Sequence, residues 1–216
     1  MWSNTPSAYV RVQGGDSITY GFGSTDGNGF RVLVDEEIAR TRGVGAIASG
    51  SAICSGTLFD RMSGGSGQET DEILTALNVD IPLYHPEIVR INAGTNDSNH
   101  RVSGAGTPPT LPQTVANISS MIDAAALVGA KVVLMCPLTP NAVTSYDDAL
   151  ILQDAAILAM VSAHTYVDSV TLVDARAVTL AIPGWAALRP DATHPGDVEY
   201  AALAVAIAEG ELSALS

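Results

Sequence analysis

The chain has 216 residues, 47% of them hydrophobic and 15% charged, a composition typical of a globular protein with a sizeable core and not of a disordered one. Its formal net charge is −13, from 23 acidic and 10 basic residues, and Lys131 is the only lysine. Such a surface repels phosphate groups, which argues against nucleic acids and anionic membranes as partners and favours a neutral or cationic substrate. No segment is long and apolar enough to span a bilayer, so we expect no membrane-spanning helix.

The first predicted element is a strand over Tyr9–Val12, which leads into the turn Gly14-Gly15-Asp16-Ser17. A serine at such a strand-to-loop switch lies where open α/β sheets place their ligands. The two glycines let the backbone turn sharply and approach a substrate closely. Taken alone, this turn is weak evidence of function, because Gly, Asp and Ser are common in turns of every kind.

The next stretch is less regular. A helix is expected from Gly29 onward, because apolar residues recur on one face at helical spacing. Residues 44–48 are a weak candidate for the second strand. Residues 49–67 are rich in Gly and Ser, which predicts a surface loop, and a short helix ending near Leu77 should follow.

The rest of the chain alternates further strands with helices. Strands are predicted over 87–92, 131–136 and 170–173, and the second of these is a continuous apolar run, as in a buried parallel strand. Residues 98–112 and 182–190 are predicted to be loops, and the first of them could form a lid over a site.

Helices complete this pattern. They are expected around 115–126, stopped by Gly129, around 151–161, and from near Asp197 to just before Gly210. Strands that alternate with helices predict an α/β fold with a parallel sheet covered by helices on both faces. Nothing marks a domain boundary, so we expect a single domain over residues 1–216.

Four short polar blocks recur at the ends of predicted elements. They are the turn with Ser17, the pair Ser66-Gly67, the run Gly94-Thr95-Asn96-Asp97 and the run Asp191-Ala192-Thr193-His194-Pro195. In this order and spacing the chain resembles the SGNH (GDSL-type) hydrolases from about Val10 to Tyr200. The resemblance implies a three-layer α/β/α sandwich with a flavodoxin-like doubly wound sheet of about five parallel strands.

The blocks carry the groups that acyl transfer needs. Ser17 is the candidate nucleophile, and His194 is the best available base because imidazole titrates near neutral pH. Asp191 lies three residues before His194, so a tight turn can bring its carboxylate to the histidine Nδ1 atom. Without the other blocks, Asp191 would be interpreted as a turn former and His194 as a surface residue.

The tetrahedral intermediate also needs preorganised donors for its oxyanion. The resemblance assigns three: the backbone N–H groups of Ser17 and Gly67 and the side-chain amide of Asn96. Asn96 could instead form an Asx turn and Gly67 could serve loop flexibility, in which case Gly64 or Gly65 would be the second donor.

Within the family, the segment from Ser63 to Ile73 looks most like the second block of acetyl xylan esterases of carbohydrate esterase family 3. Those esterases usually read His-Glu-Gly-His-Ser-Gly-Trp there, whereas this chain has Met62, Gly65 and Gln68 at the two His positions and the Trp position. The frame is kept, but the imidazole and indole groups are missing. This departure bears on a xylan specificity more than on the chemistry.

Three further residues are candidates for contact with substrate. Asp16 could contact substrate or brace the nucleophile turn, and His100 could reach the site from the 98–112 loop. Trp185 could line an acyl or sugar pocket or serve packing. No cofactor and no metal are expected, because no His, Cys, Asp and Glu residues show metal-ligand spacing and no Gly-rich loop has the Rossmann or Walker form.

The two cysteines, Cys54 and Cys136, form no metal-binding or redox motif. The strand order of the SGNH family places strands one and three between the strands near these cysteines. Three strand spacings amount to roughly 14 Å, and a disulfide needs Cα atoms within about 7 Å. We therefore expect two free thiols.

These observations favour a serine hydrolase of small carboxylic esters that deacetylates carbohydrates through an acyl-enzyme. A thioesterase, lysophospholipase or aryl esterase would use the same machinery, and a non-catalytic carbohydrate-binding module would keep only the fold. The expected partner is a small-molecule or oligosaccharide ester, with no nucleic acid and no membrane, while the oligomeric state stays open. The chain is either cytoplasmic or secreted after removal of a signal.

Overall fold

The computed structural model describes residues 9–27, 29–42 and 57–216. Its centre is one five-stranded sheet in the order β2-β1-β3-β4-β5, and every pairing in it is parallel. The strands are β1 (Tyr9–Gly15), β2 (Thr57–Ser63), β3 (Ile88–Asn92), β4 (Lys131–Met135) and β5 (Val170–Val173). The chain reverses direction across the sheet after β2, so the crossover from β1 to β2 and the later crossovers pass over opposite faces and the sheet is doubly wound.

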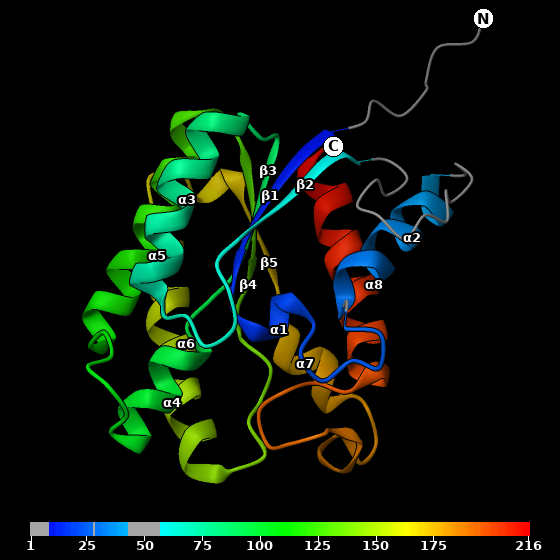
Figure 1. Cartoon of the computed structure of the whole chain (residues 1–216). Coiled ribbons are helices and arrows are strands. Elements are labelled where there is room, and N and C mark those ends of the chain that lie inside the picture. The colour runs from blue at the N-terminus through cyan, green and yellow to red at the C-terminus, as the bar shows by residue number, and fades with distance from the viewer. Residues whose placement is uncertain (1–8, 28, 43–56) are drawn as a thin grey trace, which may run out of the picture.

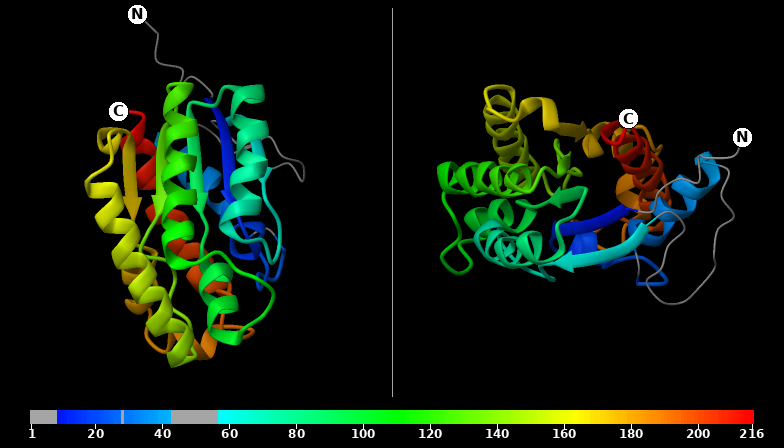
Figure 2. Two further views of the ribbon diagram at one scale, coloured as in Figure 1. Left: turned by 90° about the vertical axis from the view of Figure 1, so that its left-hand side faces the viewer. Right: turned by 90° about the horizontal axis from the view of Figure 1, so that it is seen from above.

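Helices cover both faces of the sheet (Figure 1). The helices are α1 (Ser17–Tyr20), α2 (Phe30–Arg42), α3 (Thr70–Tyr84), α4 (Thr95–Ser103), α5 (Leu111–Leu127), α6 (Thr144–Ser162), α7 (Ala175–Leu180) and α8 (Asp197–Ala214), with short 3₁₀ turns η1 (Val167–Ser169) and η2 (Trp185–Leu188). Helices α3, α5 and α6 lie on one side, and α2 and α8 lie on the other (Figures 1 and 2). This is the predicted three-layer α/β/α sandwich around a five-stranded parallel sheet, so the predicted architecture is confirmed. Among the described residues, no helix has the length and apolarity to cross a bilayer.

Alternation along the strands builds two cores, because successive side chains of a strand point to opposite faces. One core joins β1, β3 and β4 to α3, α5 and α6, and the other joins β3, β4 and β5 to α2 and α8. Fully buried members of the first include Val12, Leu77, Ile91, Ile118 and Val132, and those of the second include Phe30, Val34, Ile88, Val133 and Leu203. Burial of each such side chain contributes about 1.5–3 kcal/mol.

A buried charge cluster lies in the second core. Arg11 of β1 donates to Asp35 of α2 and to Glu211 of α8, at 3.1 Å in each case. Arg90 of β3 donates to Glu211 and, at 2.6 Å, to the Oε1 atom of Gln13. These bonds between guanidinium and carboxylate groups tie both helices of this layer to the central strands. Removal of one member would leave its partner charged and buried, which costs several kcal/mol.

Strand β2 is formed by residues for which the sequence pattern predicts a loop. Strand β2 occupies Thr57–Ser63, inside the stretch 49–67 for which a loop is predicted, so that prediction is wrong for these seven residues. The predicted strand over 44–48 lies outside the described residues. Among the described strands, β2 lies at the edge of the sheet and pairs only with β1. An edge strand does not require the continuous apolar run of a central strand, so its sequence carries a weak signal.

Helices also extend beyond their predicted limits. Helix α3 continues to Tyr84 instead of ending near Leu77, and α4 occupies the first part of the predicted 98–112 loop. Helix α8 passes through Gly210 to Ala214. A Cβ atom at Gly210 would lie 3.0 Å from a methyl group of Val173, so this glycine serves the close approach of α8 to β5 and does not stop the helix.

Cys136 lies directly after β4 and is a free, buried thiol. Its sulfur is 3.8 Å from the carbonyl oxygen of Asp154 and 3.9 Å from that residue's carboxylate. Burial, together with the nearby charges of Asp154 and Asp174, raises the pKa of the thiol well above its usual range. Because the thiolate is the reactive form, Cys136 should be inert in the folded protein. Cys54 lies outside the described residues.

We predict that titration with a thiol reagent, without reductant, finds two reactive thiols per chain after denaturation. In the native protein the Cys136 thiol should not react, so the Cys136→Ser variant should lose one thiol from the denatured count and none from the native count. A count of zero after denaturation would mean that the two cysteines are joined, contrary to the strand-spacing argument.

Candidate active site

The predicted site residues gather at one edge of the sheet, where the carboxyl ends of its strands meet. Ser17 follows β1, Asn96 follows β3, and the segment 189–196 runs past the same edge before α8 begins. Figure 1 shows α1 at this lower end of the sheet. Chain segments more than 170 residues apart are therefore brought together where parallel α/β sheets bind ligands.

The nucleophile turn is formed by a tight approach of backbone to side chain. Ser17 is the first residue of α1, and Asp16 is its N-cap: the Asp16 Oδ1 atom accepts a hydrogen bond from the Ile18 N–H at 2.9 Å. At Gly15, a Cβ atom would lie 2.1 Å from the hydroxyl oxygen of Thr19, so only glycine fits there. Ser17 is only 5% exposed, and its orientation is determined by the turn.

Ser17, His194 and Asp191 form a continuous hydrogen-bonded chain. The Ser17 Oγ atom lies 2.9 Å from the His194 Nε2 atom, and the His194 Nδ1 atom lies 2.8 Å from Asp191 Oδ2. The other carboxylate oxygen, Asp191 Oδ1, accepts hydrogen bonds from the backbone N–H groups of Thr193 and His194, both at 2.8 Å. Burial works to raise the pKa of Asp191, but these hydrogen bonds from His194 and Thr193 outweigh it and hold the pKa below its usual value. Asp191 therefore stays ionised beside the His194 ring.

Arg189 holds the loop that carries Asp191 and His194. Its guanidinium is buried and donates to Glu199 in the first turn of α8, with bonds of 2.7 and 2.9 Å. It also donates to the carbonyl oxygen of Pro140 at 2.6 Å and to those of Ala192 and Thr193 at 3.3 Å. The loop backbone is thus fixed to α8 and to the segment after β4.

Sequence reasoning missed this arginine. The only local hint is the spacing of Gly196 and Glu199, whose carboxylate accepts the Gly196 N–H as in a capping box. Trp185, a candidate for substrate contact, lies half-buried in η2. The Arg189 guanidinium packs over its indole ring, with the Arg189 Cζ atom 4.5 Å from the ring centroid. Trp185 therefore supports the same loop.

Backbone donors surround the nucleophile turn. Among the described residues, nothing accepts a hydrogen bond from the N–H of Ser17 or of Gly67. Gly67 has φ of +79°, a conformation that favours glycine, and the space beside it is open. Gly64, the alternative donor, has φ of +114°, and a Cβ atom there would lie 2.3 Å from the Gly15 carbonyl oxygen. Close packing against the nucleophile turn accounts for Gly64.

Asn96 lies in the first turn of α4, and its amide donates to the Gln68 carbonyl oxygen at 2.9 Å. The second hydrogen of this amide is left for another acceptor. The neighbouring residue, Asp97, is fully buried and accepts hydrogen bonds from the backbone and hydroxyl of Thr70 and from the hydroxyl of Thr114. Asp97 thereby fixes the start of α4 to the start of α3.

His100 lies one helical turn after Asn96, on α4, and not on a lid loop. Its Nδ1 atom is 2.6 Å from a carboxylate oxygen of Glu69, the N-cap of α3. His100 thus joins the same pair of helices that Asp97 joins. Its ring is partly exposed beside the segment that carries Gly67 and Gln68.

The chain matches the GDSL-like lipase/acylhydrolase family over residues 15–202. It belongs to this family. The match spans both the nucleophile turn and the Asp191–His194 loop, and it makes the protein a carboxylic ester hydrolase. A search of curated proteins finds no significant match.

Several solved structures share the fold of this GDSL-like hydrolase. One is an acetyl esterase mutant with an acetate ion (23% identity, TM-score 0.69, covering 94% of this chain and 97% of that chain). Another is an acetylxylan esterase from Geobacillus stearothermophilus (18%, 0.72, 94% and 94%). A third is a carbohydrate esterase of family 3 from Talaromyces cellulolyticus (20%, 0.70, 94% and 97%). At these identities the likeness shows the common fold.

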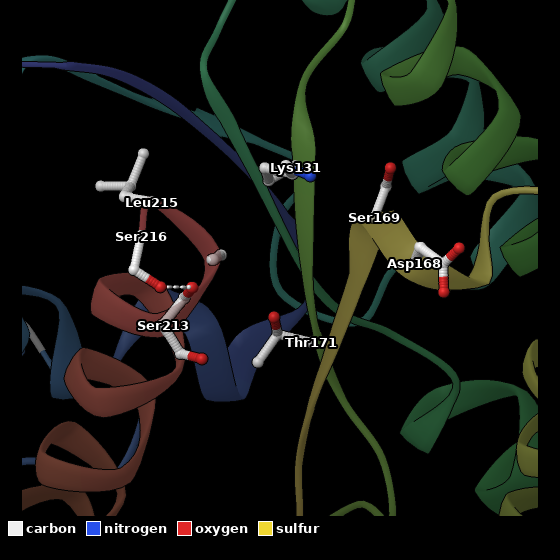
Figure 3. Close-up of a pocket in the computed structure, with 8 residues that line it drawn as sticks. Lys131, Asp168, Ser169, Thr171, Ser213, Leu215 and Ser216 are labelled. Carbon is white, nitrogen blue, oxygen red and sulfur yellow. Dashed lines mark hydrogen bonds between the residues drawn. The ribbon is translucent and has the colours of Figure 1, made fainter.

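A pocket of about 530 Å³ lies at the opposite edge of the sheet of this hydrolase (Figure 3). Lys131 at the start of β4, Ser169 and Thr171 at β5, and Ser213 and Ser216 at the end of α8 are among its lining residues. None of the predicted site residues lines it, so it takes no part in the candidate site. Among the described residues, no group of three or more His, Cys, Asp or Glu side chains is placed to hold a metal ion.

Asp16 is 1% exposed beneath the turn, which favours the bracing role over contact with substrate. Its Oδ2 atom is buried and has no hydrogen-bond partner among the described residues. Burial is the main cause that raises the pKa of this carboxyl from 3.8 to about 7, and the charge of Asp97 adds to the shift. The bond from Ile18 opposes the shift without cancelling it.

We predict that ionisation of the Asp16 carboxyl makes the folded hydrolase less stable as pH rises. Its carboxyl binds a proton more tightly in the folded state, so the free energy of unfolding should fall between about pH 4 and 7 and stay low above that range. Each pKa unit corresponds to about 1.4 kcal/mol. The Asp16→Asn variant keeps the capping oxygen and cannot ionise, so its melting temperature should fall less than that of the wild type between pH 5 and 8.

The comparison of these two proteins isolates Asp16. Asp154, whose pKa burial also raises to about 7, is present in both and contributes equally. If the two melting temperatures depend on pH in the same way, the pKa of Asp16 is the same in the folded and unfolded states, contrary to the prediction.

Proposed function

We propose that the protein hydrolyses small carboxylic esters through a covalent acyl-enzyme on Ser17. The hydrogen-bonded chain from Ser17 through His194 to Asp191 is the observation that carries this proposal. A serine hydroxyl is a weak nucleophile by itself, and a base within hydrogen-bond reach activates it. The depressed pKa of Asp191 keeps a negative charge beside the histidine throughout turnover.

In the first half-reaction, the Ser17 Oγ atom attacks the acyl carbon while the His194 Nε2 atom takes the hydroxyl proton. The carbonyl oxygen becomes an oxyanion, which the N–H groups of Ser17 and Gly67 and the second amide hydrogen of Asn96 would stabilise. His194 then gives its proton to the leaving alcohol as the ester bond breaks. In the second half-reaction, water attacks the acyl carbon while His194 takes a proton from it. His194 then returns that proton to the Ser17 Oγ atom as the acyl bond breaks, which releases the carboxylic acid and restores the free serine.

We propose that the natural substrate is an acetylated carbohydrate. The solved structures of similar fold include an acetyl esterase, an acetylxylan esterase and a family 3 carbohydrate esterase. The block around Ser66 and Gly67 resembles that of family 3 esterases, and a net charge of −13 suits a neutral ester. A screen of esters with acyl chains of increasing length, beside acetylated xylan and chitin oligomers, tests the assignment: the highest kcat/KM should fall on acetyl groups of a carbohydrate.

We predict that the Ser17→Ala variant loses hydrolysis of acetyl esters and labelling by a fluorophosphonate, and keeps the wild-type melting temperature within a few degrees. Removal of the nucleophile should reduce kcat by a factor on the order of 10⁶. Ser120→Ala is a matched control, because the Ser120 hydroxyl donates only to a carbonyl within its own helix, α5. Turnover near the wild-type rate in Ser17→Ala would remove Ser17 from the mechanism.

We predict that Asn96→Ala lowers kcat by about 10²–10³, the usual effect of losing one oxyanion donor. KM should change much less, because the bond forms only as the oxyanion develops. Asn78→Ala, at an exposed asparagine of α3, controls for loss of an amide elsewhere. A raised KM with unchanged kcat would assign Asn96 to uniform substrate binding instead.

A further inference from the structure

One aromatic side chain beside the triad has no partner in the mechanism described above. Phe22 lies in the loop after α1, and its ring is 55% exposed to solvent. The same ring packs on the imidazole of His194, with ring centroids 4.4 Å apart and planes inclined at 51°. An apolar ring that touches the general base on one side and solvent on the other is available to a substrate.

The loop holds Phe22 rigidly in this position. The Phe22 N–H donates to the Ser17 carbonyl oxygen at 2.9 Å, and the Phe22 carbonyl oxygen accepts the hydroxyl of Tyr200 at 2.7 Å. The flanking glycines, Gly21 and Gly23, have φ of +95° and +96°. A Cβ atom at Gly23 would lie 3.2 Å from the His194 Cβ atom, so this loop packs directly on the histidine segment. The exposed ring is therefore preorganised, which lowers the entropic cost of binding against it.

The chemistry decides which part of an ester meets this ring. The acyl oxygen must point toward the oxyanion donors at Ser17, Gly67 and Asn96. The alcohol oxygen must instead face the His194 Nε2 atom, because that atom delivers the proton on departure. A group packed on His194 therefore lies beside the leaving alcohol and not beside the acyl chain.

We infer that Phe22 determines specificity by binding the alcohol half of the substrate, a ring such as a sugar, through its exposed face. The apolar C–H face of a sugar ring fits an aromatic face, and the contact buries apolar surface of Phe22 that water otherwise covers. This inference rests on the proposed function and assigns the ring that recognises the leaving group. Family 3 esterases usually have a tryptophan at the position of Gln68. Phe22 would give this chain an aromatic contact that Gln68 cannot supply.

The test compares Phe22→Ala, Phe22→Tyr and wild type on acetyl esters that differ only in the alcohol: methyl acetate and a mono-acetylated methyl xylopyranoside. For Phe22→Ala, kcat/KM on the sugar ester should fall about tenfold, mainly through KM, and should change less than about twofold on methyl acetate. Phe22→Tyr should retain the preference of the wild type. Tyr166→Ala is the matched control, because Tyr166 is also an exposed ring packed on a histidine, His164, far from the site.

A second measurement separates substrate binding from support of His194. After the alcohol has left, acetyl-Ser17 is the same species for every acetyl ester. Its hydrolysis, followed by pre-steady-state kinetics with 4-nitrophenyl acetate, should be unchanged in Phe22→Ala if the ring binds only the alcohol. An equal loss on both esters, with slower hydrolysis of acetyl-Ser17, would show that Phe22 only positions His194 and would overturn the inference.

The remaining outcomes are also decisive. A changed preference for acyl chain length at a constant alcohol would place the ring on the acyl side and overturn the inference. If the wild type is active and Phe22→Ala has the same kcat/KM as the wild type on both esters, the inference is overturned but the proposed function is not. A wild type without activity on any acetyl ester would overturn the proposed function, and the inference with it.

Discussion

The geometry of the candidate site depends on the buried ion pair between Arg189 and Glu199. The loop that bears Asp191 and His194 lies between η2 and α8, and the Asp191 carboxylate is half-exposed. Its backbone would be free to move without the guanidinium that binds the carbonyl oxygens of Ala192 and Thr193. A buried ion pair contributes little net stability, because desolvation offsets most of the attraction. Its value here is positional: it fixes the histidine to within the tolerance that proton transfer requires.

The first turn of α8 anchors both halves of the candidate triad. Glu199 holds the histidine loop through Arg189, while the adjacent residue, Tyr200, donates to the carbonyl oxygens of Ile18 and Phe22 on the nucleophile side. Asp197, at the start of the helix, accepts the backbone N–H of Thr25 at 2.8 Å. A single rigid helix therefore sets the separation of serine and histidine. The opposite end of that helix is tied to the central strands through Glu211, so the whole element is held at both ends.

Short motifs in the sequence mark those residues of the candidate site whose arrangement depends on local structure. Ser17 lies in a turn that needs glycine, and Asp191 reaches His194 across three residues, so short motifs are enough to mark them. Arg189 also contacts Pro140, and Phe22 contacts His194; both partners are distant in the chain, and a single sequence contains no local signal of these two contacts.

The same distinction applies to the fold. Central strands such as β4 are buried on both faces and therefore read as continuous apolar runs. Among the described strands, β2 pairs only with β1, and its sequence, Thr-Leu-Phe-Asp-Arg-Met-Ser, shows neither a continuous apolar run nor a regular alternation, so its position could not be predicted. Likewise, Gly210 resembles a helix terminus in sequence, and only the packing of α8 on Val173 shows why a glycine is needed within the helix.

The location of the single lysine has a practical consequence. Lys131 is exposed at the amino end of β4, whereas the candidate catalytic residues lie at the carboxyl ends of the strands. Amine-directed coupling to a support or a dye has no other lysine to modify, so side-chain attachment occurs on the face remote from the ester-binding edge. A chain attached through Lys131 would present its candidate catalytic edge to the solution.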